Sequence, residues 1–192
     1  MDKKKIVAIQ GSFRNNGMTS AMLKFAVEKA KEIGHEVLYI NLFDKKIEYC
    51  RGCRKCLETA DCIFTNDDFK EVAAAIKAAD VIMLASPVYW ANVPAIVKNL
   101  FDRMSGTSME ETDKFPKPRL AGKKYIMLTT CNTQAPFSYL CGQTKGLYRV
   151  TKEYFKTSGI SCIGKVAQTG TGKHKEMTER TKCKIEKLVE RI

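Results

Sequence analysis

Apolar residues follow two different periods along this chain, and the two periods alternate. Short continuous apolar runs rich in β-branched residues are typical of buried strands, and they occupy residues 6–9, 37–40, 81–85, 125–128 and 160–166. After each run, apolar residues recur every three or four positions, which predicts helices with one buried face; these patterns cover residues 22–33, 69–76, 96–101, 140–155 and 177–192. The sequence therefore predicts five strands and five helices in strict alternation.

Residues that begin and end helices stand at the borders of these patterns. Gly34 and Gly159 suit the left-handed turn that follows many helices. The cluster Thr65-Asn66-Asp67-Asp68 precedes the second helical pattern, and we expect Pro94 in the first turn of the third helix. These positions support the same order of elements.

Strict alternation also determines the kind of sheet that we expect. Parallel strands need a crossover connection, and right-handed crossovers place helices on both faces of the sheet. The predicted fold class is α/β, with three layers around a doubly wound five-stranded parallel sheet of order 2-1-3-4-5. Ligands of such folds bind beyond the carboxyl ends of strands 1 and 3.

The length of 192 residues suits a single domain, which we predict over residues 1–192. Two connections, residues 43–64 and 104–123, are too long for simple turns. Long loops in compact domains are commonly functional. We interpret the first as a cysteine-rich insertion at about residues 43–66.

The composition is that of an ordinary globular protein, with 44% apolar and 28% charged residues. No apolar run approaches the roughly 20 residues of a membrane helix, and the first residues lead into no signal-peptide core, so we expect a cytoplasmic protein without membrane association. The net charge of +12 attracts anions. The lysines are spread along the chain, which favours a solvated basic surface over a nucleic-acid face.

The segment after the first strand, Gly11 to Ser20, has the chemistry of a phosphate site. It matches neither the glycine spacing of a dinucleotide-binding loop nor a Walker A loop. It offers three hydroxyls, two amides, an arginine and a helix start, whose free amide groups attract phosphate. A residue that merely caps the helix would explain one hydroxyl and leave Arg14 unexplained. A terminal phosphate monoester is therefore the ligand that fits.

Two aromatic residues, Tyr89 and Trp90, follow the third predicted strand. Such large, rigid and amphipathic side chains suit the wall of a site for a flat aromatic cofactor. Core packing is the alternative, and it applies especially to Trp90. Their position at the edge of the sheet where ligands bind favours a contact with the cofactor.

Four cysteines within the insertion form the pattern Cys-x2-Cys-x2-Cys-x5-Cys; they are Cys50, Cys53, Cys56 and Cys62. The cytosol keeps thiols reduced, so a disulfide framework is not expected. Four thiolates hold an iron–sulfur cluster, and this spacing lets one loop wrap three corners of a 4Fe-4S cube. The charges of Arg51, Arg54 and Lys55 would stabilise an anionic cluster.

Three alternative roles of these cysteines stay open. A structural zinc ion uses four cysteines, although such sites typically pair two separated Cys-x2-Cys motifs. The spacing of positions 50, 53 and 56 also fits one buried stripe of a helix. Finally, the segment could hold no metal at all.

Taken together, the motifs resemble a known family. Gly-Ser-x-Arg-x-x-Gly-x-Thr after the first strand, joined to Ser-Pro-Val-Tyr-Trp at residues 86–90, is similar to the NADPH-dependent FMN reductase and iron-sulfur flavoprotein branch of the flavodoxin-like superfamily. The resemblance covers nearly the whole chain. It implies a flavodoxin-like fold and FMN as the cofactor.

The resemblance also implies residue roles. The first loop would hold the FMN phosphate through Ser12, Arg14, Asn16, Gly17, Met18, Thr19 and Ser20. Two further loops would lie along the isoalloxazine ring, contributing Pro87, Val88, Tyr89, Trp90, Ala91, Asn92, Thr130 and Asn132. The four cysteines would bind a 4Fe-4S cluster, and the chains would form homodimers or homotetramers in which one subunit's cluster faces its neighbour's FMN.

We therefore predict an FMN-dependent oxidoreductase that takes electrons, with NAD(P)H as a candidate donor, and passes them through a cluster to a protein or small-molecule acceptor. One alternative is a cluster-free NAD(P)H-dependent reductase of FMN, quinones or nitro compounds. A flavodoxin-type carrier is disfavoured by the charge of +12, and a nucleic-acid-binding redox regulator would rest on that charge alone. His35 and His174 form no recognisable catalytic pattern, so no acid–base catalyst is assigned.

Overall fold

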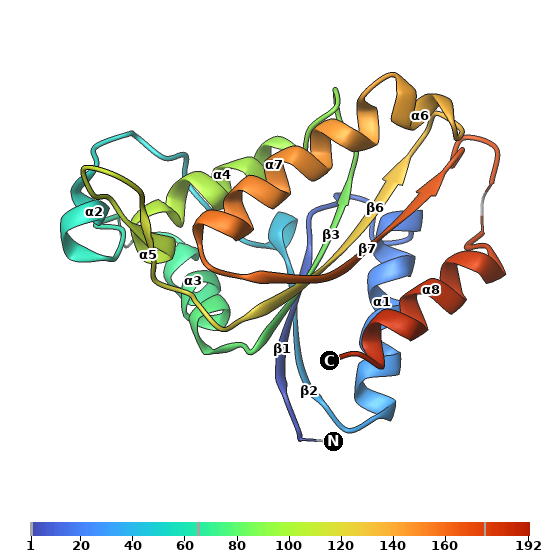
Figure 1. Ribbon diagram of the computed structural model, residues 1–192, viewed down its shortest axis with the longest axis horizontal. Coiled ribbons are helices and arrows are strands. Elements are labelled where there is room, and N and C mark those ends of the chain that lie inside the picture. The colour runs from blue at the N-terminus through green and yellow to red at the C-terminus, as the bar shows by residue number, and fades with distance from the viewer. Residues whose placement is uncertain (1, 65, 175) are drawn as a thin grey trace.

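A computed structural model describes residues 2–64, 66–174 and 176–192 of the chain. Its centre is a five-stranded parallel sheet of order β2-β1-β3-β6-β7 (Figure 1). The strands are β1 (Lys5–Gln10), β2 (Glu36–Asn41), β3 (Val81–Pro87), β6 (Lys124–Cys131) and β7 (Ser161–Thr169). Numbered as strands of this sheet alone, the order is 2-1-3-4-5, which confirms the predicted flavodoxin-like α/β fold.

Helices cover both faces of the sheet. The longer ones are α1 (Met18–Glu32), α3 (Phe69–Ala78), α4 (Ala95–Arg103), α7 (Gln143–Thr157) and α8 (Glu179–Val189). Helices α1 and α8 pack side by side on one face, and α3, α4 and α7 cover the other (Figure 1). None of the described helices is both long enough and apolar enough to cross a membrane.

Successive side chains of a strand point to opposite faces, so the sheet supplies two separate cores. In β1, Ile6 and Ala8 pack with α1 and α8, whereas Val7 and Ile9 pack with α3, α4 and α7. The central strands are buried on both faces, which explains why they read as continuous apolar runs in the sequence.

The fourth predicted helix begins later than its apolar pattern indicates. The pattern places Leu140 on it, but this residue lies in a separate short helix, α6 (Phe137–Leu140), and is 71% exposed. Gly142, with a φ of 76°, separates α6 from α7. The apolar periodicity of the sequence therefore continues from α6 into α7, although the helix itself is interrupted at this glycine.

Smaller differences concern other helix ends. Pro94 caps α4 from the position before its first residue, and Met177 and Ile192 flank α8 instead of belonging to it. Gly34 and Gly159 adopt the left-handed conformation after α1 and α7, as predicted. Of the predicted helix-start cluster, Thr65 lies outside the described residues, and the remainder directly precedes α3.

The two long connections contain short elements that the apolar pattern does not predict. The first holds the 3-10 turn η1 (Leu42–Asp44) and helix α2 (Lys55–Thr59). The second holds helix α5 (Ser105–Ser108) and the antiparallel pair β4 (Met109–Glu110) and β5 (Lys117–Pro118). Helices α2 and α5 pack against each other, so both connections meet at one end of the molecule (Figure 1).

Candidate functional site

A cavity of about 500 Å³ opens beyond the carboxyl ends of β1, β3 and β6, where the fold predicts a ligand site. We call it the strand-end cavity. Three predicted loops meet there, and they contribute Ser12, Arg14, Gly17, Met18, Thr19, Pro87, Val88, Tyr89, Thr130 and Asn132. Its volume lies within the range of about 300–1,000 Å³ that is usual for cofactor sites.

The first loop delivers the N-terminus of α1 to this cavity. Gly17 is the N-cap and supplies no side-chain hydrogen bond, and the first turn of α1 contains no acidic residue. The first amides of a helix have no partner within the helix, so they stay available to an anion. Arg14 is exposed at the rim and forms no ion pair with any described residue.

A buried polar network holds this loop from behind. Gln10 donates from Nε2 to the Ser12 carbonyl (2.8 Å) and to Asn15 Oδ1 (2.9 Å), and it accepts a hydrogen bond from the Tyr39 hydroxyl. Asn41 donates to the same Asn15 oxygen at 3.2 Å. The side chains of β1 and β2 therefore fix the loop before any ligand binds.

Two hydroxyl groups join the start of α1 to the end of β6 inside the cavity. The oxygens of Thr19 and Thr130 are 2.7 Å apart and both residues are buried. Thr171 and Gly172 also line the cavity, although sequence reasoning gave them no role. A Cβ on Gly172 would stand 2.3 Å from Asn132 Oδ1, so a larger residue there would displace the Asn132 side chain.

Five predicted cofactor residues do not line the cavity: Asn16, Ser20, Trp90, Ala91 and Asn92. The Ser20 hydroxyl donates to the Arg14 carbonyl at 2.6 Å, so it shapes the loop from inside. Trp90 is fully exposed, which excludes core packing in this conformation, and it has a φ of 50°. Tyr89 and Asn92 close that turn with two mutual backbone hydrogen bonds of 2.8 and 2.9 Å.

The four cysteines of the pattern lie on the segment 50–62, which we call the cysteine segment. Cys50 and Cys53 are exposed, whereas Cys56 and Cys62 are half-buried. Cys50 and Cys56 line a second cavity of about 470 Å³ between this segment, α4, α5 and α7. Within the described ranges, no three His, Cys, Asp or Glu side chains come close enough together to hold a metal ion.

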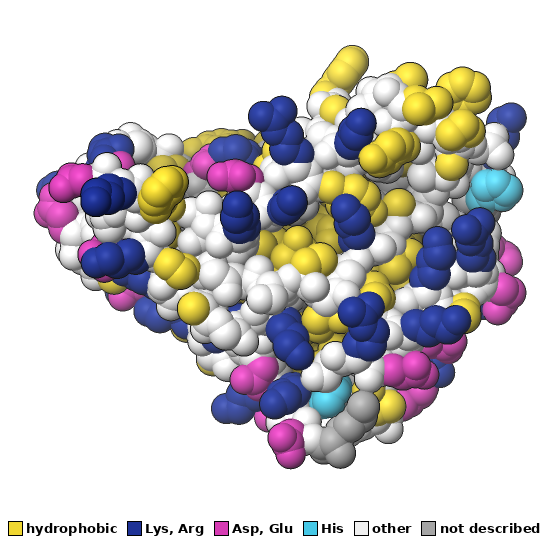
Figure 2. Space-filling model, viewed as in Figure 1, with side chains coloured by type: hydrophobic (Ala, Val, Ile, Leu, Met, Phe, Trp, Pro, Cys, Tyr) yellow, Lys and Arg dark blue, Asp and Glu magenta, His cyan; other side chains and the backbone are white. Residues whose placement is uncertain are grey.

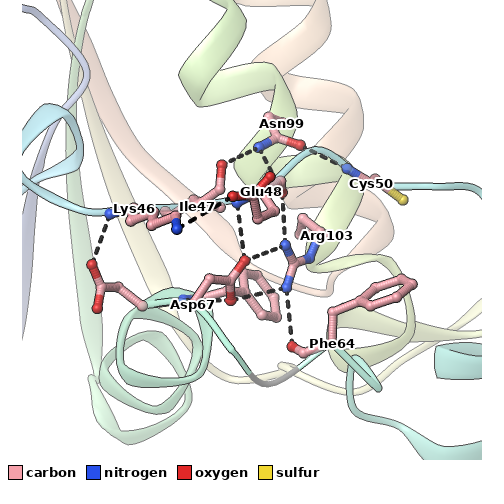
Figure 3. Close-up of polar contacts among 10 residues, drawn as sticks. Lys46, Ile47, Glu48, Cys50, Phe64, Asp67, Asn99 and Arg103 are labelled. Carbon is pink, nitrogen blue, oxygen red and sulfur yellow. Dashed lines mark hydrogen bonds and ion pairs between the residues drawn. The ribbon is translucent and has the colours of Figure 1, made fainter.

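Both flanks of the cysteine segment are fastened to α4 (Figure 3). Arg103 donates to the carbonyl of Glu48 (2.7 Å) and to that of Phe64 (3.2 Å). Its guanidinium also forms two hydrogen bonds with the Asp67 carboxylate, at 2.7 and 3.2 Å. Asn99, one helical turn earlier, accepts from the Cys50 amide at 3.1 Å.

The side chains of Arg103 and Asp67 are 0% and 2% exposed. Burial raises the pKa of the Asp67 carboxyl, but hydrogen bonds from Arg103 and from the amides of Glu48 and Phe69 outweigh it, so the pKa is lowered. Burial lowers the pKa of Arg103, yet the contacts with Asp67 and Cys62 leave it raised. Both groups therefore keep their charge over the physiological range.

The strand-end cavity and the cavity beside the cysteine segment share no lining residue. In Figure 1, α2 and α5 lie at the left end, while α6, which follows β6, lies at the upper right. Figure 2 shows Lys and Arg scattered over the same face, with apolar side chains gathered over α6. The basic charge is therefore dispersed on this face.

A doubly wound parallel sheet with an uncapped helix start beside a cavity at its strand ends defines a flavodoxin-like fold with a candidate anion site. The family model described as NADPH-dependent FMN reductase matches residues 4–145. The chain belongs to this family.

Several curated proteins named iron-sulfur flavoprotein are similar to the chain. The one from Archaeoglobus fulgidus is 41% identical over 100 residues, which is 52% of this chain and 45% of the relative. The one from Methanocaldococcus jannaschii is 39% identical over 99 residues, which is 52% of this chain and 51% of the relative. The matched part of the chain thus spans about half the length of these relatives.

Among solved structures, an FMN-dependent NADH-azoreductase from Bacillus anthracis in complex with FMN has a TM-score of 0.75 and 16% identity. The match covers 99% of each chain. At this identity the likeness establishes the fold.

Proposed function

We propose that this chain is an FMN-dependent oxidoreductase that binds FMN in the strand-end cavity. The observation that carries the proposal is the convergence of an uncapped helix start, Arg14 and the hydroxyls of Thr19 and Thr130 on one cavity without acidic lining. Amide, guanidinium and hydroxyl donors at one point suit a phosphate monoester. When bound, FMN would exchange electrons between a two-electron donor and one-electron carriers.

Different residues around the cavity would then contact different parts of FMN. The start of α1, with Ser12 and Arg14, would hold the phosphate, while the network around Gln10 keeps that loop in shape. Pro87, Val88 and Tyr89 would line the ring on one side and Asn132 on another, together with Thr171 and Gly172. The roles of Asn16, Ala91 and Asn92 would be indirect, through the shape of the two loops.

We further propose that the cysteine segment binds a 4Fe-4S cluster through Cys50, Cys53, Cys56 and Cys62. The donor chemistry fits, because four thiols within one segment are the usual ligands of such clusters. The sulfurs do not converge in the described conformation, so the exposed middle of the segment would have to rearrange. The names of the relatives from archaea support the same cofactor.

A homo-oligomer would bring the two sites together. The two cavities of one chain share no lining residue, and we propose that the cysteine segment of one copy faces the flavin of another. Exposed apolar side chains such as Trp90 in the turn after β3, and Phe137 and Leu140 on α6, offer surface for such a contact. We propose NAD(P)H as donor and a protein or small molecule as acceptor, and a cytoplasmic location.

A cluster-free NAD(P)H-dependent reductase is the second candidate. It is favoured by one observation, the separation of the four thiols among the described residues. In that case the cysteine segment would serve as a structural flap over the 470 Å³ cavity.

The visible spectrum of anaerobically purified protein, with iron and acid-labile sulfide analysis, tests these proposals. Flavin bands on a broad absorbance with about four irons and four sulfides per chain would support the iron–sulfur flavoprotein. Flavin without iron would support the second candidate. Protein that binds no FMN even when it is added would contradict both.

A further inference from the structure

The cysteine segment combines an exposed middle with fixed flanks. Gly52, Arg54 and Ala60 have φ values of 64°, 60° and 62°, so the middle turns sharply at three places. Such left-handed residues let a short segment change direction within a few positions. The flanks, by contrast, are hydrogen-bonded to one face of α4. The side chains on that face therefore determine how the segment is attached.

Arg103 is the centre of this attachment. It is 1% exposed, and its two terminal nitrogens reach the carbonyls of Glu48 and Phe64 at 2.7 and 3.2 Å (Figure 3). These carbonyls stand two residues before Cys50 and two residues after Cys62. One guanidinium therefore closes the segment into a loop at its base.

The charge of Arg103 is fully compensated. Asp67 pairs with it through both carboxylate oxygens, and the ring of Phe69 lies 4.4 Å from the guanidinium carbon. The Nε atom of this side chain is buried and donates a hydrogen bond to no described residue. A buried donor without a partner is costly, so an acceptor at this place is expected.

The Cys62 side chain interacts with the Arg103 guanidinium. It is half-buried and packs against the core cluster to which Val97 and Leu100 of α4 belong. A thiolate sulfur accepts hydrogen bonds, and hydrogen bonds to cluster sulfurs are among the features that set a cluster's potential. Cys62 thus differs from Cys50 and Cys53, which are exposed.

We propose that Arg103 is a positioning residue of the cysteine segment, which fastens both flanks to α4 and offers its Nε hydrogen to the Cys62 sulfur. The Cys62 ligand is thereby held in place before the other three gather. This inference rests on the cluster binding proposed above. Lysine cannot replace arginine here, because it lacks both the planar fork and the Nε group.

The test compares Arg103→Lys with two other variants of α4. Lys98→Met is the matched control, because Lys98 lies on the exposed side of the same helix and, among the residues that the structure describes, forms an ion pair with Asp102 alone. Asn99→Ser removes the contacts with the first flank and leaves the guanidinium untouched. Far-ultraviolet circular dichroism and FMN content identify variants that are folded.

Amide hydrogen exchange of the iron-free protein reports the attachment itself. In Arg103→Lys we expect faster exchange in peptides on both flanks, residues 46–50 and 62–64, and unchanged exchange in the phosphate loop, residues 11–20. Asn99→Ser should change the first flank alone, and Lys98→Met neither. Unchanged exchange on both flanks of Arg103→Lys would contradict the attachment.

Anaerobic reconstitution with iron and sulfide reports the role toward Cys62. We expect Arg103→Lys to retain iron against a chelator about 10- to 100-fold less well than the wild type, as is usual when a supporting residue is lost. Its cluster should also have a lower reduction potential, because one hydrogen bond to sulfur is missing. Asn99→Ser should keep the wild-type potential, which separates a purely structural effect from the proposed one.

The outcomes separate the two proposals. Wild type that takes up no iron would contradict the cluster and the role of Nε together, whereas equal retention and potential in wild type and Arg103→Lys would contradict the role of Arg103 alone. If Arg103→Lys does not fold, Arg103→Gln with Asp67→Asn replaces it, since removing both charges leaves no unpaired buried ion. The same expectations then apply to that double variant.

Discussion

Arg14 is the cation that lines the strand-end cavity, and its contribution can be measured separately from that of the flavin ring. A charge-assisted hydrogen bond contributes about 1.5–3 kcal/mol, so Arg14→Gln should raise the Kd of FMN about 10- to 150-fold. Riboflavin lacks the phosphate, and its Kd should not change. Fluorescence titration with both ligands makes the comparison.

A control variant excludes a general effect of lost charge. Lys31→Gln removes the same charge near the other end of α1, at an exposed position. It should bind both ligands as the wild type does. Equal weakening of FMN and riboflavin by Arg14→Gln would place the arginine at the ring and contradict the phosphate site.

The buried pair of Asp67 and Arg103 gives stability a predictable dependence on pH. Because the pKa of Asp67 is lowered in the folded protein, its contribution is complete above about pH 4, the unfolded pKa, and is lost as the pH falls through the folded value. Asp67→Asn should unfold more easily at pH 7, by about 3–5 kcal/mol, since it leaves a buried guanidinium unpaired. Its stability should change less between pH 5 and the folded pKa than that of the wild type.

Urea unfolding at a series of pH values measures both effects. Lys45 and Glu71 form an exposed pair on neighbouring elements, and Glu71→Gln serves as the control with little effect at any pH. A wild-type acid slope that persists in Asp67→Asn would mean that other carboxyl groups cause it.

The sequence could predict the residues of the phosphate loop because a helix start, hydroxyls and an arginine follow one another within ten positions. The turn Gly170-Thr171-Gly172 beyond β7 is too unspecific a pattern to assign Thr171 and Gly172 to the cavity. Arg103 was also missed. An arginine at the end of an amphipathic helix normally suggests an exposed residue, and only its buried partner Asp67, 36 positions away, makes it part of the interior.

Helix α7 supports the turn after β3 by a close approach at Gly146. A Cβ at this position would stand 2.1 Å from the Ala91 carbonyl oxygen. Gly146→Ala should therefore displace the turn that begins at Tyr89, cost about 1–3 kcal/mol of stability and weaken FMN binding. Thermal unfolding and FMN titration test this, with Lys152→Ala on the exposed side of α7 as the control.

A result for Gly146→Ala equal to that of Lys152→Ala would show that the turn adapts without effect on the cavity. Loss of stability without loss of FMN affinity would separate the turn from the site. Either result would contradict the expectation that FMN binding depends on the contact between α7 and the turn that begins at Tyr89.

The strands and long helices were predictable because burial on one or two faces imposes a clear period on the sequence. The short elements were not. Helix α2 has no buried residue and α5 has four residues, so neither carries a periodic signal. Their position depends on tertiary contact, above all at Gly106, where a Cβ would stand 1.9 Å from the Cys56 carbonyl oxygen.

The arrangement of the whole chain separates the two proposed redox sites. The strand-end cavity lies between loops of the sheet, whereas the cysteine segment extends from the face that carries α4 and α5 (Figure 1). A symmetric dimer pairs a surface with its own copy, so a segment that reaches outward can complete the site of the partner. The fold thus makes the oligomer part of the proposed electron path.

Mixed oligomers test this path. Thr19→Asp would place a carboxylate against the phosphate and prevent FMN binding, and Cys50→Ser with Cys56→Ser would prevent cluster binding. Each variant alone should lack NAD(P)H-dependent reduction of a one-electron acceptor. Subunit exchange between them should restore about a quarter of wild-type activity, since half of the dimers are mixed and each has one complete pair of sites.

Analytical ultracentrifugation of differently labelled variants verifies that mixed oligomers form. Mixed oligomers without activity would contradict transfer between subunits and require a path within one chain. Full activity in a wild-type monomer would do the same. Restored activity, by contrast, could arise only if the flavin of one chain is served by the cysteine segment of another, because neither variant holds both sites.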